Sequence, residues 1–286
     1  MLAHQRHPRG NQLIRIYMKQ NYREAKDFRS FLYMSQLLQA DGIRIAQEAH
    51  RRAMPRCMGT LYWQHNDCWP VASWSSSDYY GRWKAQHYFT RKLYQEVLVS
   101  PYRTEDALRV QVVSDRLTAI EGTLTVRLMT FGGAVVFERR VAATVPANAS
   151  VALFDEAVET VVAGHAPNAL FVSAAFEEKG RVLNDSVYFL VPLKEVALPR
   201  AVIERKVTPF TGGFSVALKS PVFARGVYLS TDEGLDDVYS DNYFDLLPGR
   251  TVVVTVRSAM AADEFNKALR VVSMCDAVVE GAPAAE

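Results

Sequence analysis

Cysteine is scarce in this sequence of 286 residues. Only three are present, Cys57, Cys68 and Cys275, and they have no CxxC spacing. An odd number with this spacing fits neither a disulfide scaffold nor a zinc site. We therefore interpret the three cysteines as unpaired core thiols.

Patterns typical of metal sites are also missing. The six histidines are scattered, and no pair has the spacing of metal ligands on one face of a helix. An acidic stretch at residues 232–241 lacks the ordered spacing and the glycine of a calcium-binding EF-hand loop, which favours a solvated loop. The sequence predicts no metal and no other cofactor.

Neither a strong net charge nor a long apolar run is present. Lys and Arg number 33 against 31 Asp and Glu, which gives a net charge of +2. That charge is too small for the general electrostatic footprint of a nucleic-acid or anionic-membrane binder. The longest apolar runs, such as residues 188–192 and 252–254, fall far short of the roughly 20 residues of a transmembrane helix. We expect no nucleic-acid partner and no membrane span.

The first hundred residues have a helical periodicity of apolar residues. The spacing of apolar residues predicts one helix that begins near Gly10, and a second, capped by Asp27, that runs to about residue 52. Residues 57–63 form a compact apolar run typical of a strand buried on both faces. A further helix is predicted from residue 81 to about residue 98. Helix, buried strand, loop and helix form the end of an α/β array.

The strand predicted at residues 57–63 has no sequence neighbour of its kind. Such strands need partners on both edges and helices on both faces. We expect those partners to lie upstream of Met1. An open hydrophobic strand also templates association, so self-association through the incomplete array is expected.

After about residue 100 the apolar residues follow a period of two. Leu108, Val110 and Val112, for example, alternate with polar residues, which is typical of half-buried antiparallel strands. Pro192 and Pro199 bracket a predicted linker, and the strand spacing fits two successive sandwiches of about 90 residues each. The predicted domains are residues 1–100, 101–196 and 197–286.

Residues 59–84 contain all four tryptophans of the chain. In the loop that follows a barrel strand, aromatic faces beside Gln, Asn and Asp are what a sugar site requires. The apolar face of a pyranose ring covers an indole, while amides and carboxylates satisfy its hydroxyls. The alternative is that these tryptophans plug the barrel mouth and pack its helix.

The run from Gly59 to Lys84 resembles the eighth strand and following loop of the β-mannosidases of glycoside hydrolase family 2. Residues 9–14 and 35–40 resemble the helices just before it. The sequence Asp-Asn-Tyr-Phe-Asp-Leu-Leu-Pro-Gly at residues 241–249 resembles a segment of their terminal immunoglobulin-like domain. The resemblance covers nearly the whole chain. It implies a C-terminal fragment of a (β/α)8 barrel followed by two immunoglobulin-like β-sandwiches.

The resemblance also implies a reaction, the retaining hydrolysis of terminal non-reducing β-D-mannose, with a β-mannoside or mannose-containing oligosaccharide as the partner. Family 2 enzymes use two glutamates about 5 to 5.5 Å apart, and in this family both lie on earlier barrel strands. Glu24, Glu48 and Glu96 fall in helices or their connections rather than at a strand end. We therefore assign no catalytic residue, and we expect the fragment alone to be inactive.

One binding residue is implied by the resemblance. Trp63 matches the tryptophan that floors the subsite for the non-reducing mannose, where its role is stacking. Gln64, Asn66, Asp67 and Trp69 lie near enough in sequence to contribute to the rim of that subsite. Asn and Asp also favour tight turns and local backbone hydrogen bonds, so Asn66 and Asp67 can equally hold the loop.

Two other functions stay open. β-Sandwiches often bind sugars, so the chain could be a carbohydrate-binding module. That function requires exposed aromatic side chains on the sandwiches, where the sequence places most aromatics at buried positions. The other alternative is a structural spacer, and the fold class cannot decide between these functions.

Overall fold

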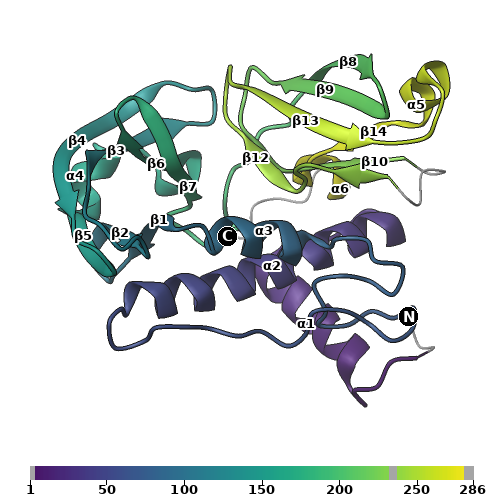
Figure 1. The fold of residues 1–286 in the computed structure, drawn as a ribbon, viewed down its shortest axis with the longest axis horizontal. Helices are drawn as coiled ribbons and strands as arrows, with labels where there is room; N and C mark the ends of the chain where they lie inside the picture. The colour runs from purple at the N-terminus through teal and green to yellow at the C-terminus, as the bar shows by residue number, and fades with distance from the viewer. Residues whose placement is uncertain (1–3, 232–236, 280–286) are drawn as a thin grey trace. The chain divides into compact units, whose positions relative to one another are not determined.

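The computed structural model describes residues 4–231 and 237–279, which divide into two compact units (Figure 1). The first unit consists of Met1–Ala40, Trp63–Tyr88 and Leu198–Glu286, and the second of Asp41–Tyr62 and Phe89–Ala197. Each unit therefore combines segments from the first hundred residues with a β-rich part. Most of the acidic stretch predicted as a solvated loop, residues 232–236, lies outside the described residues.

The helices predicted in the first hundred residues are present. Their bounds are α1 Gly10–Asn21, α2 Phe28–Arg52 and α3 Ala85–Leu93. The predicted cap of α2 forms, because Asp27 Oδ1 accepts a hydrogen bond from the backbone N–H of Ser30 at 2.7 Å. Helix α3 is shorter than predicted at both ends. It ends at Leu93, before the predicted residue 98, because Val97–Arg103 pairs as a β-strand instead.

The strand predicted at residues 57–63 is wrong for this chain. Within the described residues no strand pairs with this segment, and Leu61 is 99% exposed. The segment is instead held by single contacts: the Thr60 carbonyl accepts a hydrogen bond from Tyr94 Oη at 3.0 Å, and Thr60 Oγ1 bonds His50 Nδ1 at 2.8 Å. A parallel strand depends on hydrogen bonds along both edges and on covered faces. Apolar composition alone cannot supply either.

The cysteines are unpaired, as predicted, but none of them is a core thiol. Cys68 is exposed, and Cys57 and Cys275 are half-buried. Cys68 lies in the loop that follows residue 63, where the backbone turns repeatedly and no strand or helix covers it. The prediction assumed the burial that is usual for this residue type.

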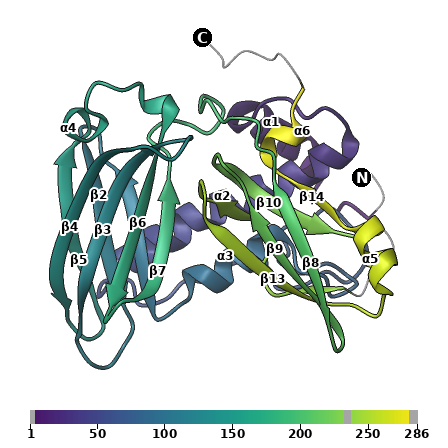
Figure 2. The same cartoon turned by 90° about the horizontal axis from the view of Figure 1, so that it is seen from above.

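The second unit contains a β-sandwich of two antiparallel sheets (Figure 2). One sheet has the order β1-β2-β5 and the other the order β4-β3-β6-β7. The bounds are β1 Val97–Arg103, β2 Ala107–Ser114, β3 Ile120–Thr130, β4 Val135–Val145, β5 Ala149–Ala157, α4 Val158–Val162, η1 Pro167–Ala169, β6 Leu170–Glu178 and β7 Arg181–Tyr188. The predicted alternation is confirmed, because Leu108, Val110 and Val112 of β2 are fully buried between the sheets.

The hairpin between β6 and β7 follows from its turn residues. Glu178 pairs with Arg181, so the turn itself consists of Lys179 and Gly180. Both have positive φ, 50° and 77°. A two-residue turn with two positive φ angles matches the right-handed twist of the strands, and glycine adopts this conformation at little cost.

The first unit contains a second β-sandwich, with the sheets β11-β13-β9-β8 and β12-β10-β14. The bounds are β8 Glu204–Phe210, β9 Gly213–Lys219, β10 Ala224–Ser230, β11 Val238–Tyr239, β12 Phe244–Leu246, β13 Thr251–Arg257, α5 Ala262–Ala268, β14 Arg270–Val272 and α6 Met274–Ala277. The apolar pattern did not predict α5, because this helix buries only Phe265. That ring stacks on Phe214 of β9 with centroids 4.0 Å apart.

Candidate functional site

The candidate site lies in residues 63–84, which we call the aromatic loop. Its backbone has little regular structure but folds back on itself within the first unit. The central segment, residues 75–77, lies between the two ends of the loop: Ser76 N–H donates to Gln64 O at 3.0 Å, Ser77 N–H to His65 O at 2.8 Å, and Lys84 N–H to Ser76 O at 2.9 Å. Such backbone hydrogen bonds between distant positions give an irregular loop a defined shape.

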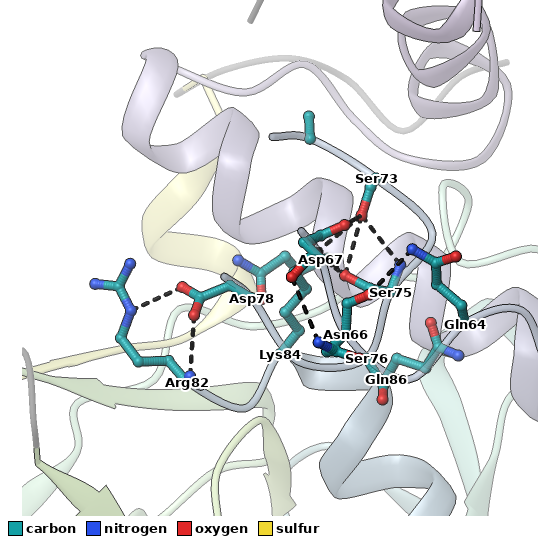
Figure 3. Close-up of polar contacts among 12 residues, drawn as sticks. Gln64, Asn66, Asp67, Ser73, Ser75, Ser76, Asp78, Arg82, Lys84 and Gln86 are labelled. Atoms are coloured by element: carbon teal, nitrogen blue, oxygen red, sulfur yellow. Dashed lines mark hydrogen bonds and ion pairs between the residues drawn. The ribbon is translucent and has the colours of Figure 1, made fainter. Parts of the chain in front are cut away.

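A buried carboxylate holds the side chains of this loop together (Figure 3). Asp67 accepts hydrogen bonds from Ser73 Oγ at 2.6 Å and from Ser75 Oγ at 2.5 Å. Lys84 Nζ lies 3.1 Å from the same carboxylate, and the side chains of Lys84 and Asp67 are 11% and 3% exposed. These four residues form what we call the Asp67 cluster.

The protonation state of Asp67 follows from this cluster. Burial would raise the pKa of the carboxyl group, but hydrogen bonds from Ser73 and Ser75, together with the bond and charge of Lys84, outweigh it. The pKa of Asp67 therefore lies below its usual value. Asp67 is ionised at neutral pH with its oxygens already occupied, which is the behaviour of a residue that holds the loop.

A second carboxylate, Asp78, organises an exposed turn of the same loop. Asp78 Oδ1 accepts hydrogen bonds from the backbone N–H groups of Tyr80 and Arg82, both at 2.9 Å. Arg82 Nε also donates to Asp78 Oδ2 at 2.7 Å, and its guanidinium lies 4.9 Å from the centre of the Tyr80 ring. Figure 3 shows this pair apart from the Asp67 cluster, so the loop has two separate carboxylate anchors.

The predicted site residues differ in their exposure and in the contacts that they make. Trp63 leaves 73% of its surface exposed, and its peptide bond to Gln64 is cis. Gln64 Nε2 donates to the carbonyl of Asn66 at 3.0 Å, and Asn66 Nδ2 to the carbonyl of Asp67 at 3.4 Å. Trp69 is half-buried, with its ring stacked on His4 at 4.9 Å and under the Arg6 guanidinium at 4.2 Å. Of the predicted set, Trp63 therefore offers the most open face.

The remaining tryptophans differ in how they pack. Trp83 stacks on His87 of α3 with ring centroids 4.2 Å apart and meets Tyr88 edge to face at 5.5 Å. This contact is of the kind that the structural alternative predicts, in which a tryptophan packs the helix. Trp74 is exposed, as are the tyrosines at positions 79 and 80.

One buried carboxylate outside the aromatic loop, Glu48, has its oxygens occupied by neighbouring side chains. Glu48, in the C-terminal part of α2, lies 3.6 Å from both Arg44 and Arg52 and accepts a hydrogen bond from Ser100 Oγ at 2.9 Å. Burial raises the pKa of Glu48, against the effect of these partners. Because its oxygens join α2 to β1, Glu48 acts in packing. In the part of the chain that the structure describes, no three His, Cys, Asp or Glu side chains are grouped to hold a metal ion.

None of the helices within residues 4–231 and 237–279 has both the length and the apolar character needed to cross a membrane.

Sequence reasoning missed three members of the Asp67 cluster, namely Ser73, Ser75 and Lys84. The run of three serines at 75–77 is visible in the sequence, but serine runs also occur in solvated loops. Lys84 lies 17 positions after Asp67, and no periodic pattern connects residues at that separation in an irregular loop. Only the folded backbone brings them together.

The comparisons with known proteins match both sandwiches. Residues 106–195 match the family described as "Mannosidase Ig/CBM-like domain", and residues 198–277 match an "Ig-fold domain" family, Ig_mannosidase. Among curated relatives, a "Beta-mannosidase" from Capra hircus is 29% identical over 268 residues, which is 88% of this chain and 30% of the relative. A "Beta-mannosidase A" from Aspergillus clavatus is 27% identical over 271 residues, covering 87% of this chain and 29% of the relative.

Solved structures with the same fold cover nearly the whole chain. A β-D-mannosidase from Dictyoglomus thermophilum superposes with a TM-score of 0.82 at 24% identity, over 93% of this chain and 32% of that one. The exo-chitosanase CsxA from Amycolatopsis orientalis gives a TM-score of 0.72 at 17% identity, over 92% of this chain and 36% of that one. The chain thus has immunoglobulin-like β domains of the β-mannosidase type, and it spans about a third of the length of these relatives.

Proposed function

We propose that this chain is the C-terminal part of a family 2 β-mannosidase and that the whole protein is a retaining glycoside hydrolase. The two domain matches and the β-mannosidase relatives support this proposal. Its substrate is terminal non-reducing β-D-mannose in a mannoside or oligosaccharide. The chain supplies one wall of the sugar site and two accessory sandwiches. It contributes no catalytic glutamate, so it is inactive alone.

In the proposed whole protein, residues 57–63 form the last strand of a (β/α)8 barrel. The support for this is their exposure, because Met58 and Leu61 are 63% and 99% exposed in this chain. Large apolar side chains that are exposed within one short segment are typical of a surface that another element covers. Residues 1–100 are then the end of the barrel domain, and residues 101–196 and 197–286 are the two sandwiches.

The observation that carries the proposal is the exposed indole of Trp63 beside a loop fixed by the Asp67 cluster. A sugar-stacking side chain must present an apolar face, and the binding loop must hold that face in place before the sugar arrives. Trp63 meets the first requirement through its exposure. The hydrogen bonds of Gln64 and Asp67 meet the second.

The carbohydrate-binding alternative is not favoured by the sandwiches. Among their described residues Phe210 is the one exposed aromatic side chain, at 45% exposure. A sugar platform needs at least one aromatic face with polar groups around it, and Phe210 ends an edge strand next to a turn. Binding of the chain to a glycan array through this edge would favour the alternative, while an absence of binding leaves the spacer role for the sandwiches.

The direct test replaces Trp63 with Ala in the whole protein. If stacking buries roughly 100 Å² of apolar surface, the loss at about 25 cal/mol per Å² is ~2.5 kcal/mol, or on the order of 70-fold. We expect kcat/KM for mannosides to fall by about one to three orders of magnitude, the larger value if stacking favours the flattened ring of the transition state.

Trp83→Ala is the control, because Trp83 packs against His87 and Tyr88 of α3. Its loss should lower the melting temperature more than it lowers activity per folded molecule. A Trp63→Ala enzyme with near-normal kcat/KM after correction for the folded fraction would refute the stacking role.

A further inference from the structure

Residues 241–245 of the terminal sandwich, Asp-Asn-Tyr-Phe-Asp, belong to a motif for which the proposed function gives no role. Two of their side chains fix the backbone. Asn242 Oδ1 accepts the Leu229 N–H at 2.8 Å, and its Nδ2 donates to the Leu229 carbonyl at 2.9 Å. Asp245 accepts two contacts from Arg225 Nη1 at 2.8 and 2.9 Å. The backbone is therefore anchored to β10 on both sides of Tyr243.

Tyr243 has a backbone conformation that its residue type rarely adopts. Its φ angle is +57°, in the left-handed region that a bulky side chain enters only at a cost. The anchors at Asn242 and Asp245 hold it there. The result is a ring that is only 3% exposed and lies against Tyr228, with centroids 4.6 Å apart.

The hydroxyl group of Tyr243 connects the sandwich to the end of the aromatic loop. Tyr243 Oη donates to Gln36 Oε1 of α2 at 3.1 Å, and the same Gln36 oxygen accepts the backbone N–H of Ala85 at 3.4 Å. Ala85 is the first residue of α3 and directly follows Lys84 of the Asp67 cluster. The Tyr243 ring also lies 6.0 Å from Tyr88 in the first turn of α3.

We propose that Tyr243 is a positioning residue for the aromatic loop. Through Gln36 it fixes the first turn of α3, which sets where Lys84 meets Asp67 and thus how the loop that follows Trp63 is held. The terminal sandwich then contributes to the sugar site without contacting the sugar. That last consequence rests on the proposed function, whereas the positioning of the loop does not.

Tyr33 is the matched control that distinguishes positioning of the loop from a purely structural role of Tyr243. Tyr33 is also buried in this ring cluster, 5.7 Å from Tyr228, and its Oη donates to the Gly226 carbonyl at 2.5 Å. It joins α2 to the same sandwich, but its hydroxyl group donates to the backbone of β10 rather than to Gln36. Removing either hydroxyl deletes one buried hydrogen bond and should lower the melting temperature similarly.

The first experiment measures hydrogen exchange of residues 73–84 in this chain. We expect Tyr243→Phe to lower their protection about tenfold, since one buried hydrogen bond is lost. Gln36→Leu should lose at least as much protection, because it also removes the bond to the Ala85 N–H. The double variant should add little to Gln36→Leu, which already lacks the Tyr243 contact. Tyr33→Phe should leave the protection of residues 73–84 within about twofold of the wild type.

Two results overturn the inference: unchanged protection in Tyr243→Phe, or an equal loss in Tyr33→Phe. If Tyr243→Phe does not fold, unchanged protection in Gln36→Leu overturns the inference instead, because that variant removes both the Tyr243 and the Ala85 contacts and leaves the tyrosine rings in place. In the whole protein we expect Tyr243→Phe to reduce kcat/KM for a mannoside several-fold more than Tyr33→Phe does. If Tyr243→Phe loosens the loop but the wild-type whole protein has no mannosidase activity, the proposed function is refuted and the positioning role stands.

Discussion

The replacement of Asp67 by Asn tests whether the Asp67 cluster holds the aromatic loop. The side chains have similar size, so the change removes mainly the negative charge and one acceptor. Asn can still accept one hydroxyl hydrogen bond from Ser73 or Ser75. What it cannot do is balance the charge of Lys84, whose ammonium lies 3.1 Å from the carboxylate and whose side chain is 11% exposed.

The expected magnitude follows from this burial. Breaking a buried ion pair by removing one partner costs about 3 to 5 kcal/mol. We take the lower end because Lys84 Nζ keeps the hydroxyl of Ser75 at 2.8 Å as a partner. About 3 kcal/mol corresponds to roughly a 150-fold increase in the open population of the loop.

Amide exchange of Ser76, Ser77 and Lys84 reports that opening directly, since their N–H groups bond across the loop. We expect exchange to accelerate by about two orders of magnitude in Asp67→Asn. Asp78→Asn is the matched control in the same loop, and its ion pair with Arg82 is exposed, so a change below about fivefold is expected. Equal acceleration in both variants, or none in Asp67→Asn, would show that the loop is held by something else.

Three other predictions use the same chain. The pKa of Asp67 in the folded chain is lowered from its usual 3.8, so the stabilisation from its ionised form is complete above pH 3.8 and is lost as the pH falls through the folded-state pKa. A change in tryptophan fluorescence below pH 3.8 should therefore occur in the wild type and be absent in Asp67→Asn. The chain alone should not hydrolyse an aryl β-mannoside, and turnover well above a heat-inactivated control contradicts this. The exposed Met58 and Leu61 should promote self-association, so light scattering that shows a monomer at high concentration, with no binding of a hydrophobic dye, counts against it.

The sequence predicted those parts of the fold that depend on local patterns. The alternation of Leu108, Val110 and Val112 identifies buried positions of a strand without knowledge of its neighbours. The cap at Asp27 depends on a residue only three positions away. The prediction of a buried strand at residues 57–63 was wrong because the burial of an apolar run depends on which elements cover it, and composition does not contain that information.

The candidate site was predictable only in its location. The tryptophans and their polar neighbours placed it in residues 63–84, but the roles of individual residues depend on contacts at long sequence separation. Asp67 shows why, since its partners lie 6, 8 and 17 positions away. Tyr243 shows it more strongly, because its hydroxyl contact with Gln36 spans 207 positions.

The state of the two loop carboxylates bears on the proposed mechanism. Retaining hydrolysis requires one carboxyl group that donates a proton and another whose oxygen attacks the sugar. Asp67 cannot donate, because its hydrogen bonds and Lys84 lower its pKa, and both of its oxygens accept hydrogen bonds inside the loop. The oxygens of Asp78 are occupied by backbone N–H groups and by Arg82. In the proposed whole protein both catalytic carboxyl groups must therefore come from outside residues 63–84, and this loop contributes through the indole of Trp63 and the groups that hold it.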